Sequence, residues 1–144
     1  IKGNELGIHK DNEKIVKVIA GKYKKAEGPE KNHNVEPIYI HVVLEEGKVF
    51  DYDVPKEHNS FIYLLKGELI IGNKKHEKTT DSSLILLERG TKLKILANKK
   101  SEFLFIAGKP IGEPIARVGP FVMNTKAEIL EAINDYNEGK FAKY

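Results

Sequence analysis

Residues 113–125 read EPIARVGPFVMNT and lead directly into a segment with helical periodicity. Gly119-Pro120 is a pair that turns the chain, and a short apolar run follows it. Thr125 and Glu128 have the Thr-x-x-Glu spacing of a capping box, which satisfies backbone N–H groups at the start of a helix. We therefore predict a terminal helix over residues 126–138.

The apolar run Phe121, Val122 and Met123 has two interpretations. In the first, it anchors the terminal helix in the core of the same domain, as contiguous apolar residues beside a strong capping signal indicate. In the second, it docks this domain against another domain of the same protein. We favour the first interpretation, and the sequence leaves the second open.

Upstream, short apolar or alternating runs are separated by turn signals. The runs that read as strands lie at residues 15–20, 38–44, 49–54, 60–65, 68–71, 75–79, 83–87, 92–96 and 102–107. Lys66-Gly67, Gly72-Asn73 and Asn98-Lys99 are interpreted as turns, and residues 1–14 as a polar N-terminal segment. Many short strands and one terminal helix predict an all-β sandwich or barrel, and we choose a jelly roll in a single domain over residues 1–144.

Composition excludes several kinds of chemistry. The 144 residues contain no cysteine, which rules out disulfides, thiolate metal sites and a cysteine nucleophile.

The net charge is +3, but only Arg89 and Arg117 are arginine and the lysines are interleaved with acids. This pattern is typical of a solvated surface rather than of a nucleic-acid footprint. The charge-rich residues 22–34 read as a loop.

The sequence shows neither a membrane-spanning pattern nor a signal-peptide pattern. No apolar run is long enough to span a bilayer, and the first residues contain no signal-peptide core, so we expect an intracellular protein without membrane contact. The first residue is Ile rather than Met, which favours a fragment of a longer protein.

Several motifs resemble those of the pirin family. They are SFIY at 60–63, GELIIG at 67–72, FIAGKPI at 105–111 and GPFVMNT at 119–125. The resemblance covers roughly residues 13–141, as judged by pattern alone. It implies a cupin-type jelly roll, or double-stranded β-helix, of antiparallel strands. Pirins are two-domain cupins, and this chain resembles the second domain, so the resemblance also implies an N-terminal cupin domain as its partner.

Cupins hold a metal with a His-x-His pair, a Glu and a further His on neighbouring strands, and this ligand set suits Fe(II). When the glycines of the motifs are aligned, these positions fall at Asp53, Pro55, Ser60 and Leu93. Pro and Leu have no side-chain ligand atom. The resemblance therefore implies neither a metal site nor a catalytic residue in this chain, and it places the Fe(II) of pirins in the missing N-terminal domain.

His41, Asp51, Asp53 and His58 are the weak candidates for ligands if a metal is found. Asp51 and Asp53 share one face of a strand and could point at the same cation. These residues also have structural interpretations, which we favour. His41 can be a hydrogen-bonded structural histidine, and the acidic residues can form a solvated strand face. The other histidines read as solvated, namely His9, His33 and His76.

Two classes of function follow from the resemblance. In the first, the chain is the metal-free structural or docking half of a protein that resembles iron-dependent quercetin 2,3-dioxygenase, and the chain alone is not an enzyme. In the second, it is a non-catalytic protein-interaction module of a pirin-type nuclear transcription cofactor, located in the nucleus of a eukaryotic source and otherwise in the cytoplasm. A complete chain that self-associates is a third interpretation.

Overall fold

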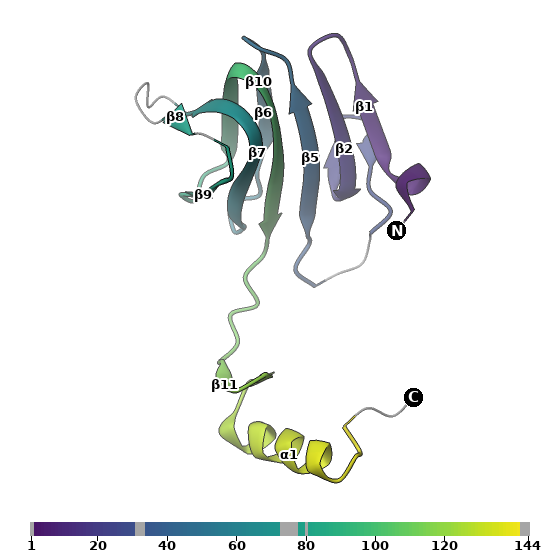
Figure 1. Cartoon of the computed structure of the whole chain (residues 1–144), viewed down its shortest axis with the longest axis vertical. Helices are drawn as coiled ribbons and strands as arrows, with labels where there is room; N and C mark the ends of the chain where they lie inside the picture. The colour runs from purple at the N-terminus through teal and green to yellow at the C-terminus, as the bar shows by residue number, and fades with distance from the viewer. Residues whose placement is uncertain (1, 31–33, 73–77, 80, 142–144) are drawn as a thin grey trace. The chain divides into compact units, whose positions relative to one another are not determined.

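The computed structural model describes residues 2–30, 34–72, 78–79 and 81–141. The chain forms two compact units, which we call the barrel unit (Ile1–Pro110) and the helical unit (Ile111–Tyr144). The barrel unit holds the large sheet, and the helical unit holds α1 (Figure 1). The expectation of one domain over residues 1–144 stays a prediction.

Among its described residues, the barrel unit contains one eight-stranded antiparallel sheet. The strand order is β1-β2-β5-β10-β7-β8, with β6 paired to β10 and β9 paired to β7. The strands are β1 (Gly7–Lys10), β2 (Lys14–Ala20), β5 (Ile38–Leu44), β6 (Val49–Asp53), β7 (Asn59–Ile71), β8 (Lys78–Thr79), β9 (Ser83–Leu87) and β10 (Lys92–Gly108). A separate hairpin joins β3 (Lys22–Tyr23) to β4 (Ala26–Glu27), and a short 3₁₀ helix spans Gly3–Glu5. The predicted all-β jelly roll is confirmed.

The two longest strands, β7 and β10, pass through segments that the sequence predicts as turns. Lys66-Gly67 lies inside β7 and Asn98-Lys99 lies inside β10, so both turn predictions are wrong. The pairing of these strands instead shifts register between Ala97 and Phe103. Such bulges bend a strand and increase its twist. The bend lets one half of β10 pair with β6 and the other half pair with β5 (Figure 1).

Most other strand predictions are confirmed with small shifts. The strands β5 and β9 have the predicted bounds. The sequence missed β1, which lies in the polar N-terminal segment, and the β3–β4 hairpin, which lies in the predicted charged loop. Residues 73–77 lie outside the described residues, as do Asn73 of the predicted hairpin and the first part of the predicted strand 75–79.

The hydrophobic core of the barrel unit is built from the inward faces of these strands. On β6, Phe50 is fully buried while Asp51 and Asp53 are exposed, as the alternation of the sequence predicts. Phe50, Phe103 and Phe105 are among the largest fully buried side chains. The interior is therefore rich in aromatic rings, which bury a large apolar area each.

The helical unit contains a short hairpin, β11 (Ala116–Val118) and β12 (Phe121–Met123), followed by α1 (Lys126–Asn137). The backbone N–H of Glu128 donates to Thr125 Oγ1 over 3.2 Å, and Glu128 Oε2 accepts from the Thr125 N–H over 2.7 Å. The predicted capping box and helix are confirmed. Hydrogen bonds from Thr125 lower the pKa of the Glu128 carboxyl.

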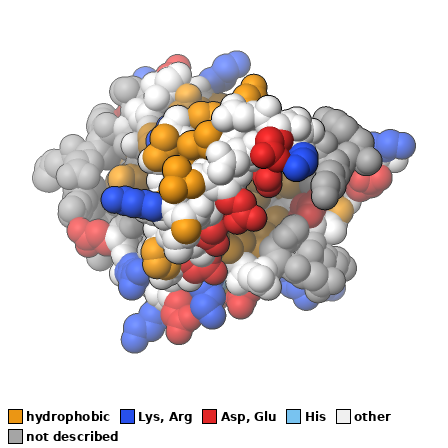
Figure 2. All heavy atoms as spheres, turned by 90° about the horizontal axis from the view of Figure 1, so that it is seen from below, with side chains coloured by type: hydrophobic (Ala, Val, Ile, Leu, Met, Phe, Trp, Pro, Cys, Tyr) orange, Lys and Arg blue, Asp and Glu red, His pale blue; other side chains and the backbone are white. Residues whose placement is uncertain are grey.

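Phe121 holds the hairpin and the helix of this unit together. Its ring lies 6.0 Å from that of Tyr136 and 5.3 Å from that of Phe141. Val122, in contrast, is 58% exposed, and Met123 is half-buried. Other large hydrophobic side chains of the unit are also exposed, namely Ile111, Ile115, Val118 and Leu130. In the view from below, hydrophobic side chains lie at the surface among charged ones (Figure 2).

Candidate functional site

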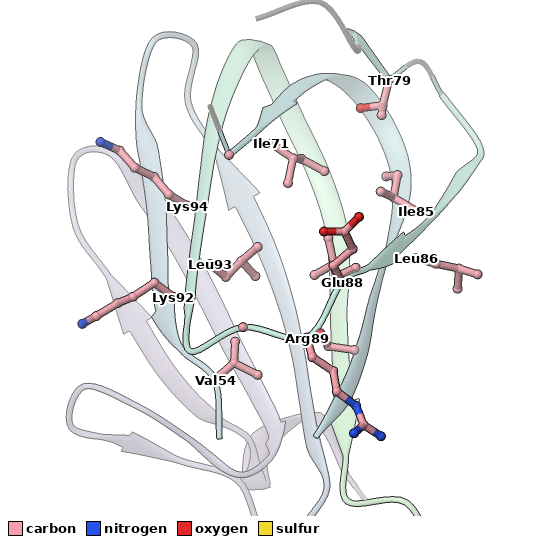
Figure 3. A pocket seen from close by; sticks show the side chains of 14 residues that line it. Val54, Ile71, Thr79, Ile85, Leu86, Glu88, Arg89, Lys92, Leu93 and Lys94 are labelled. Carbon is pink, nitrogen blue, oxygen red and sulfur yellow. The ribbon is translucent and has the colours of Figure 1, made fainter. Parts of the chain in front are cut away.

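A cavity of about 410 Å³ opens between β7, β9 and β10, beside the end of β6 (Figure 3). The side chains of Val54, Ile71, Ile85 and Leu93 point into it. Ile71, Ile85 and Leu93 come from strands β7, β9 and β10, and Val54 follows directly after β6. The cavity is therefore mainly apolar.

The charged side chains that line this cavity do not all point the same way, and the carboxylate of Glu88 is drawn beside Leu93 in Figure 3. Lys92 and Lys94 point away from the cavity (Figure 3). Lys92 Nζ lies 2.5 Å from Asp53 Oδ1, and this hydrogen bond raises the pKa of Lys92. Arg89 Nε donates to Asn59 Oδ1 over 3.3 Å. The site can accept an apolar group, but none of these contacts forms an acid–base pair directed into it.

The four positions that match cupin ligands do not all lie at this cavity. Ser60 and Leu93 line the cavity, whereas Asp53 and Pro55 do not. The Asp53 side chain is 79% exposed, and Val54 takes the inward position beside it. The four positions therefore do not converge on one point. Within residues 2–30, 34–72, 78–79 and 81–141, no group of three or more His, Cys, Asp or Glu residues is placed to hold a metal.

The weak ligand candidates also lie apart. His41 Nε2 is 2.8 Å from Glu102 Oε1, on the outward face of the sheet. Asp53 pairs with Lys92, and Asp51 is exposed on β6. His58 is only 3% exposed, its Nε2 lies 3.9 Å from Glu36 Oε2, and its Nδ1 has no hydrogen-bond partner in the described structure.

Of the remaining histidines, the described structure includes only His9, which is paired with an acidic side chain. His9 Nε2 lies 3.0 Å from Asp11 Oδ2, and its ring packs edge-on against Tyr23. The Asp11 carboxyl also accepts the backbone N–H groups of Glu13 and Lys14, and these hydrogen bonds lower its pKa to about 2. The other two, His33 and His76, lie outside the described residues.

Stacked aromatic rings fill the barrel interior beside β6. Phe50 stacks on Tyr23 at 5.3 Å between ring centroids, and Tyr52 lies 5.2 Å from Phe105. Burial raises the pKa of Tyr23 to about 12 and raises that of Tyr52, so both phenols stay neutral at physiological pH. Sequence reasoning missed Tyr23, because it lies among lysines without any apolar period.

A second cavity lies in the helical unit between the hairpin and α1. Its volume is about 610 Å³, and its walls include Ile115, Val118, Ile129 and Leu130. Ile115 and Leu130 are 81% and 64% exposed, respectively. This groove is mainly apolar and open, and none of its lining residues is His, Cys, Asp or Glu.

No helix in the described part of the chain is long and apolar enough to cross a membrane.

Comparison with known proteins gives a consistent result. Residues 39–142 match the model of the pirin C-terminal cupin domain. Pirin from Rattus norvegicus is 36% identical over 106 residues, which are 72% of this chain and 36% of that protein. A pirin-like protein from Caulobacter vibrioides is 32% identical, with 92% of this chain and 47% of that protein covered.

A crystal structure of a quercetin 2,3-dioxygenase from Acinetobacter baumannii has a TM-score of 0.85 and 32% identity, and the match covers 99% of this chain and 50% of that one. The chain thus spans half or less of the length of these relatives. The family model covers most of the large sheet and α1, and the relatives match the same part of the chain. The chain therefore belongs to the pirin family as a C-terminal cupin domain.

Proposed function

We propose that this chain is the metal-free structural and docking half of a two-domain pirin-like protein. In that protein, which resembles iron-dependent quercetin 2,3-dioxygenase, an N-terminal cupin domain holds the Fe(II). This chain then braces that domain and contributes no residue to the chemistry. Rigid packing around a neighbouring site is a recognised way to hold catalytic groups in place.

The aromatic packing of the barrel interior carries the proposal. A metal-binding cupin needs imidazole and carboxylate groups that converge from neighbouring strands. Here the inward positions near the end of β6 hold Phe50, Tyr52 and Val54, and Leu93 faces them from β10. Fe(II) does not fit this set of side chains, because Phe50, Val54 and Leu93 have no ligand atom and the Tyr52 hydroxyl donates to the carbonyl oxygen of Lys22 over 2.8 Å.

The exposed apolar residues of the helical unit support a docking role. Phe121 packs inside that unit, so Val122, Ile115 and Leu130 are better placed than Phe121 to contact another domain. A unit of 34 residues, Ile111–Tyr144, is too short to bury a core large enough for independent stability. Docking onto a neighbouring surface would supply the missing burial.

Quercetin turnover tests the proposal. The 144-residue chain, supplied with Fe(II) and oxygen, is expected to consume quercetin no faster than Fe(II) alone. The two-domain protein, prepared in the same way, is expected to turn it over. Turnover by the chain alone, abolished by His41→Ala or His58→Ala, would contradict the proposal.

A protein-interaction module of a transcription cofactor is the second candidate. Leu84 and Leu86 favour it, because they are 60% and 78% exposed on the outward face of the barrel unit. Exposed apolar patches of this kind mark contact sites for other proteins or domains. In this second candidate, a separate protein would cover the outward face that carries Leu84 and Leu86.

A further inference from the structure

The cavity between β7, β9 and β10 combines apolar walls with one carboxylate. Val54 and Leu93 are each 7% exposed and belong to the core, and they line the cavity on one side. Ile71 and Ile85 are partly buried, pack against the same core and line it from β7 and β9. The carboxylate belongs to Glu88, which directly follows β9 and points into the cavity in Figure 3. An acidic group thus lies beside a surface that is otherwise mainly apolar.

The charge of Glu88 is not compensated by a neighbouring side chain. Within the described residues, its carboxylate forms no hydrogen bond and no ion pair. The cationic side chains of the lining are directed elsewhere. Lys92 and Lys94 point away from the cavity (Figure 3), and Arg89 Nε donates to Asn59 Oδ1 over 3.3 Å. A ligand that enters the cavity therefore meets one anionic group and no cationic group that is directed at it.

The volume of the cavity sets the size of the ligand. Closed apolar cavities of about 150 Å³ are large enough to bind benzene. This cavity has a volume of about 410 Å³, so it has room for an alkyl chain or a ring of about six carbons with a polar group attached. The apolar part of such a ligand would be stabilised by the area that it removes from water.

The lone carboxylate sets the charge of the ligand. Hydrogen bonds from an ammonium group to a carboxylate are roughly twice as strong as neutral ones, because both partners are charged. A bare metal ion is disfavoured, since hard cations take several oxygen ligands and Glu88 is the one acidic side chain among the described residues of the lining. A quaternary ammonium group is disfavoured as well, because it is recognised by aromatic rings and no aromatic residue is among those that line this cavity.

We propose that this cavity binds a small primary amine with an apolar body. The ammonium group donates to the Glu88 carboxylate, while the alkyl chain or ring packs on Val54, Ile85 and Leu93. This site goes beyond the proposed function, because it requires neither an N-terminal half nor a metal. The competing ligand is an apolar carboxylate held by Arg89 at the rim, and the experiment distinguishes the two.

Methyl NMR titration of the 144-residue chain tests the proposal. The probes are hexylamine, 1-hexanol and hexanoate, which share an alkyl chain and differ in charge. Hexylamine is expected to shift the methyl signals of Val54, Ile71, Ile85 and Leu93. It should bind at least about tenfold more tightly than 1-hexanol, because only the amine makes charged hydrogen bonds to the carboxylate. Heptylamine should bind about fourfold more tightly than hexylamine if its additional methylene is also buried.

Two variants locate the effect. Glu88→Gln keeps the size of the side chain and removes its charge, and it is expected to weaken hexylamine binding at least about tenfold. Glu46→Gln is the matched control, since Glu46 is exposed in the turn after β5 and does not line the cavity. This variant removes the same charge and is expected to leave the affinity unchanged.

Each outcome decides the proposal. Tighter binding of hexylamine that Glu88→Gln abolishes and Glu46→Gln preserves supports it. Equal affinities for hexylamine and 1-hexanol overturn it, because the carboxylate then contributes nothing. Tighter binding of hexanoate also overturns it and assigns the cavity to apolar anions. The same holds for shifts that appear only at methyl groups outside the cavity. The comparison of probes uses the unaltered chain, so it decides the question even if Glu88→Gln does not fold.

Discussion

Replacement of Phe50 by Ala is expected to lower the free energy of unfolding of the barrel unit by about 3–5 kcal/mol. Phe50 has no exposed surface, and its ring packs 5.3 Å from Tyr23 and 5.6 Å from Phe103. Truncation removes these contacts and leaves a cavity that the surrounding strands cannot close. Because small domains are stable by roughly 5–15 kcal/mol, the variant should lose a large part of its stability. Urea unfolding followed by circular dichroism measures the loss.

Phe61→Ala is the matched control, since Phe61 lies half-buried on the outer face of β7. Its cost in the isolated chain should be about 1 kcal/mol, in proportion to its smaller burial. If Phe50→Ala cost no more than Phe61→Ala, the barrel interior would be an open cavity rather than a packed aromatic core. The argument against a metal site in the barrel would then lose its support.

Replacement of Gly67 by Ala is expected to destabilise the barrel unit by roughly 2–5 kcal/mol. Gly67 has a φ of +100°, and an added Cβ would overlap the Ser101 hydroxyl and lie 2.5 Å from the carbonyl oxygen of Lys100. Ser101 is 1% exposed and accepts the backbone N–H of Glu68, so it has little room to move. Urea unfolding is again the measurement.

Gly47→Ala separates the two causes of this loss. Gly47 has a φ of +72° but no atom within 4 Å of the added Cβ. Backbone strain alone should cost it about 1–2 kcal/mol. If Gly67→Ala were no worse than Gly47→Ala, β10 would not approach β7 closely at this point, and the bend in both strands would need another explanation.

The sequence alone was sufficient to predict the elements whose structure depends on residues close together in the chain. The helix start follows from Thr125 and Glu128 alone, because both partners of the capping box lie within one turn. The alternation along β6 likewise fixes which of its residues face inward. That alternation also explains why Asp53 points away from the cavity, a consequence that an alignment on glycines does not reveal.

Features that depend on distant partners could not be predicted in this way. Gly67 reads as a turn because a positive φ is common there, and only its contact with Ser101 of β10 distinguishes a bulge from a hairpin. Tyr23 is surrounded by lysines in the sequence, and it becomes a core residue only because Phe50 stacks on it. The outward row of Tyr39, Ile106, Phe61 and Leu86 exists only after β5, β10, β7 and β9 have paired in register.

Iron content tests the central claim most directly. The 144-residue chain would be loaded anaerobically with Fe(II), desalted and analysed for metal by mass spectrometry. We expect essentially no bound iron, because the inward positions around Phe50 and Leu93 offer no ligand set. One iron per chain would contradict the claim, and Ala variants of His41, Asp51, Asp53 and His58 would then identify the ligands.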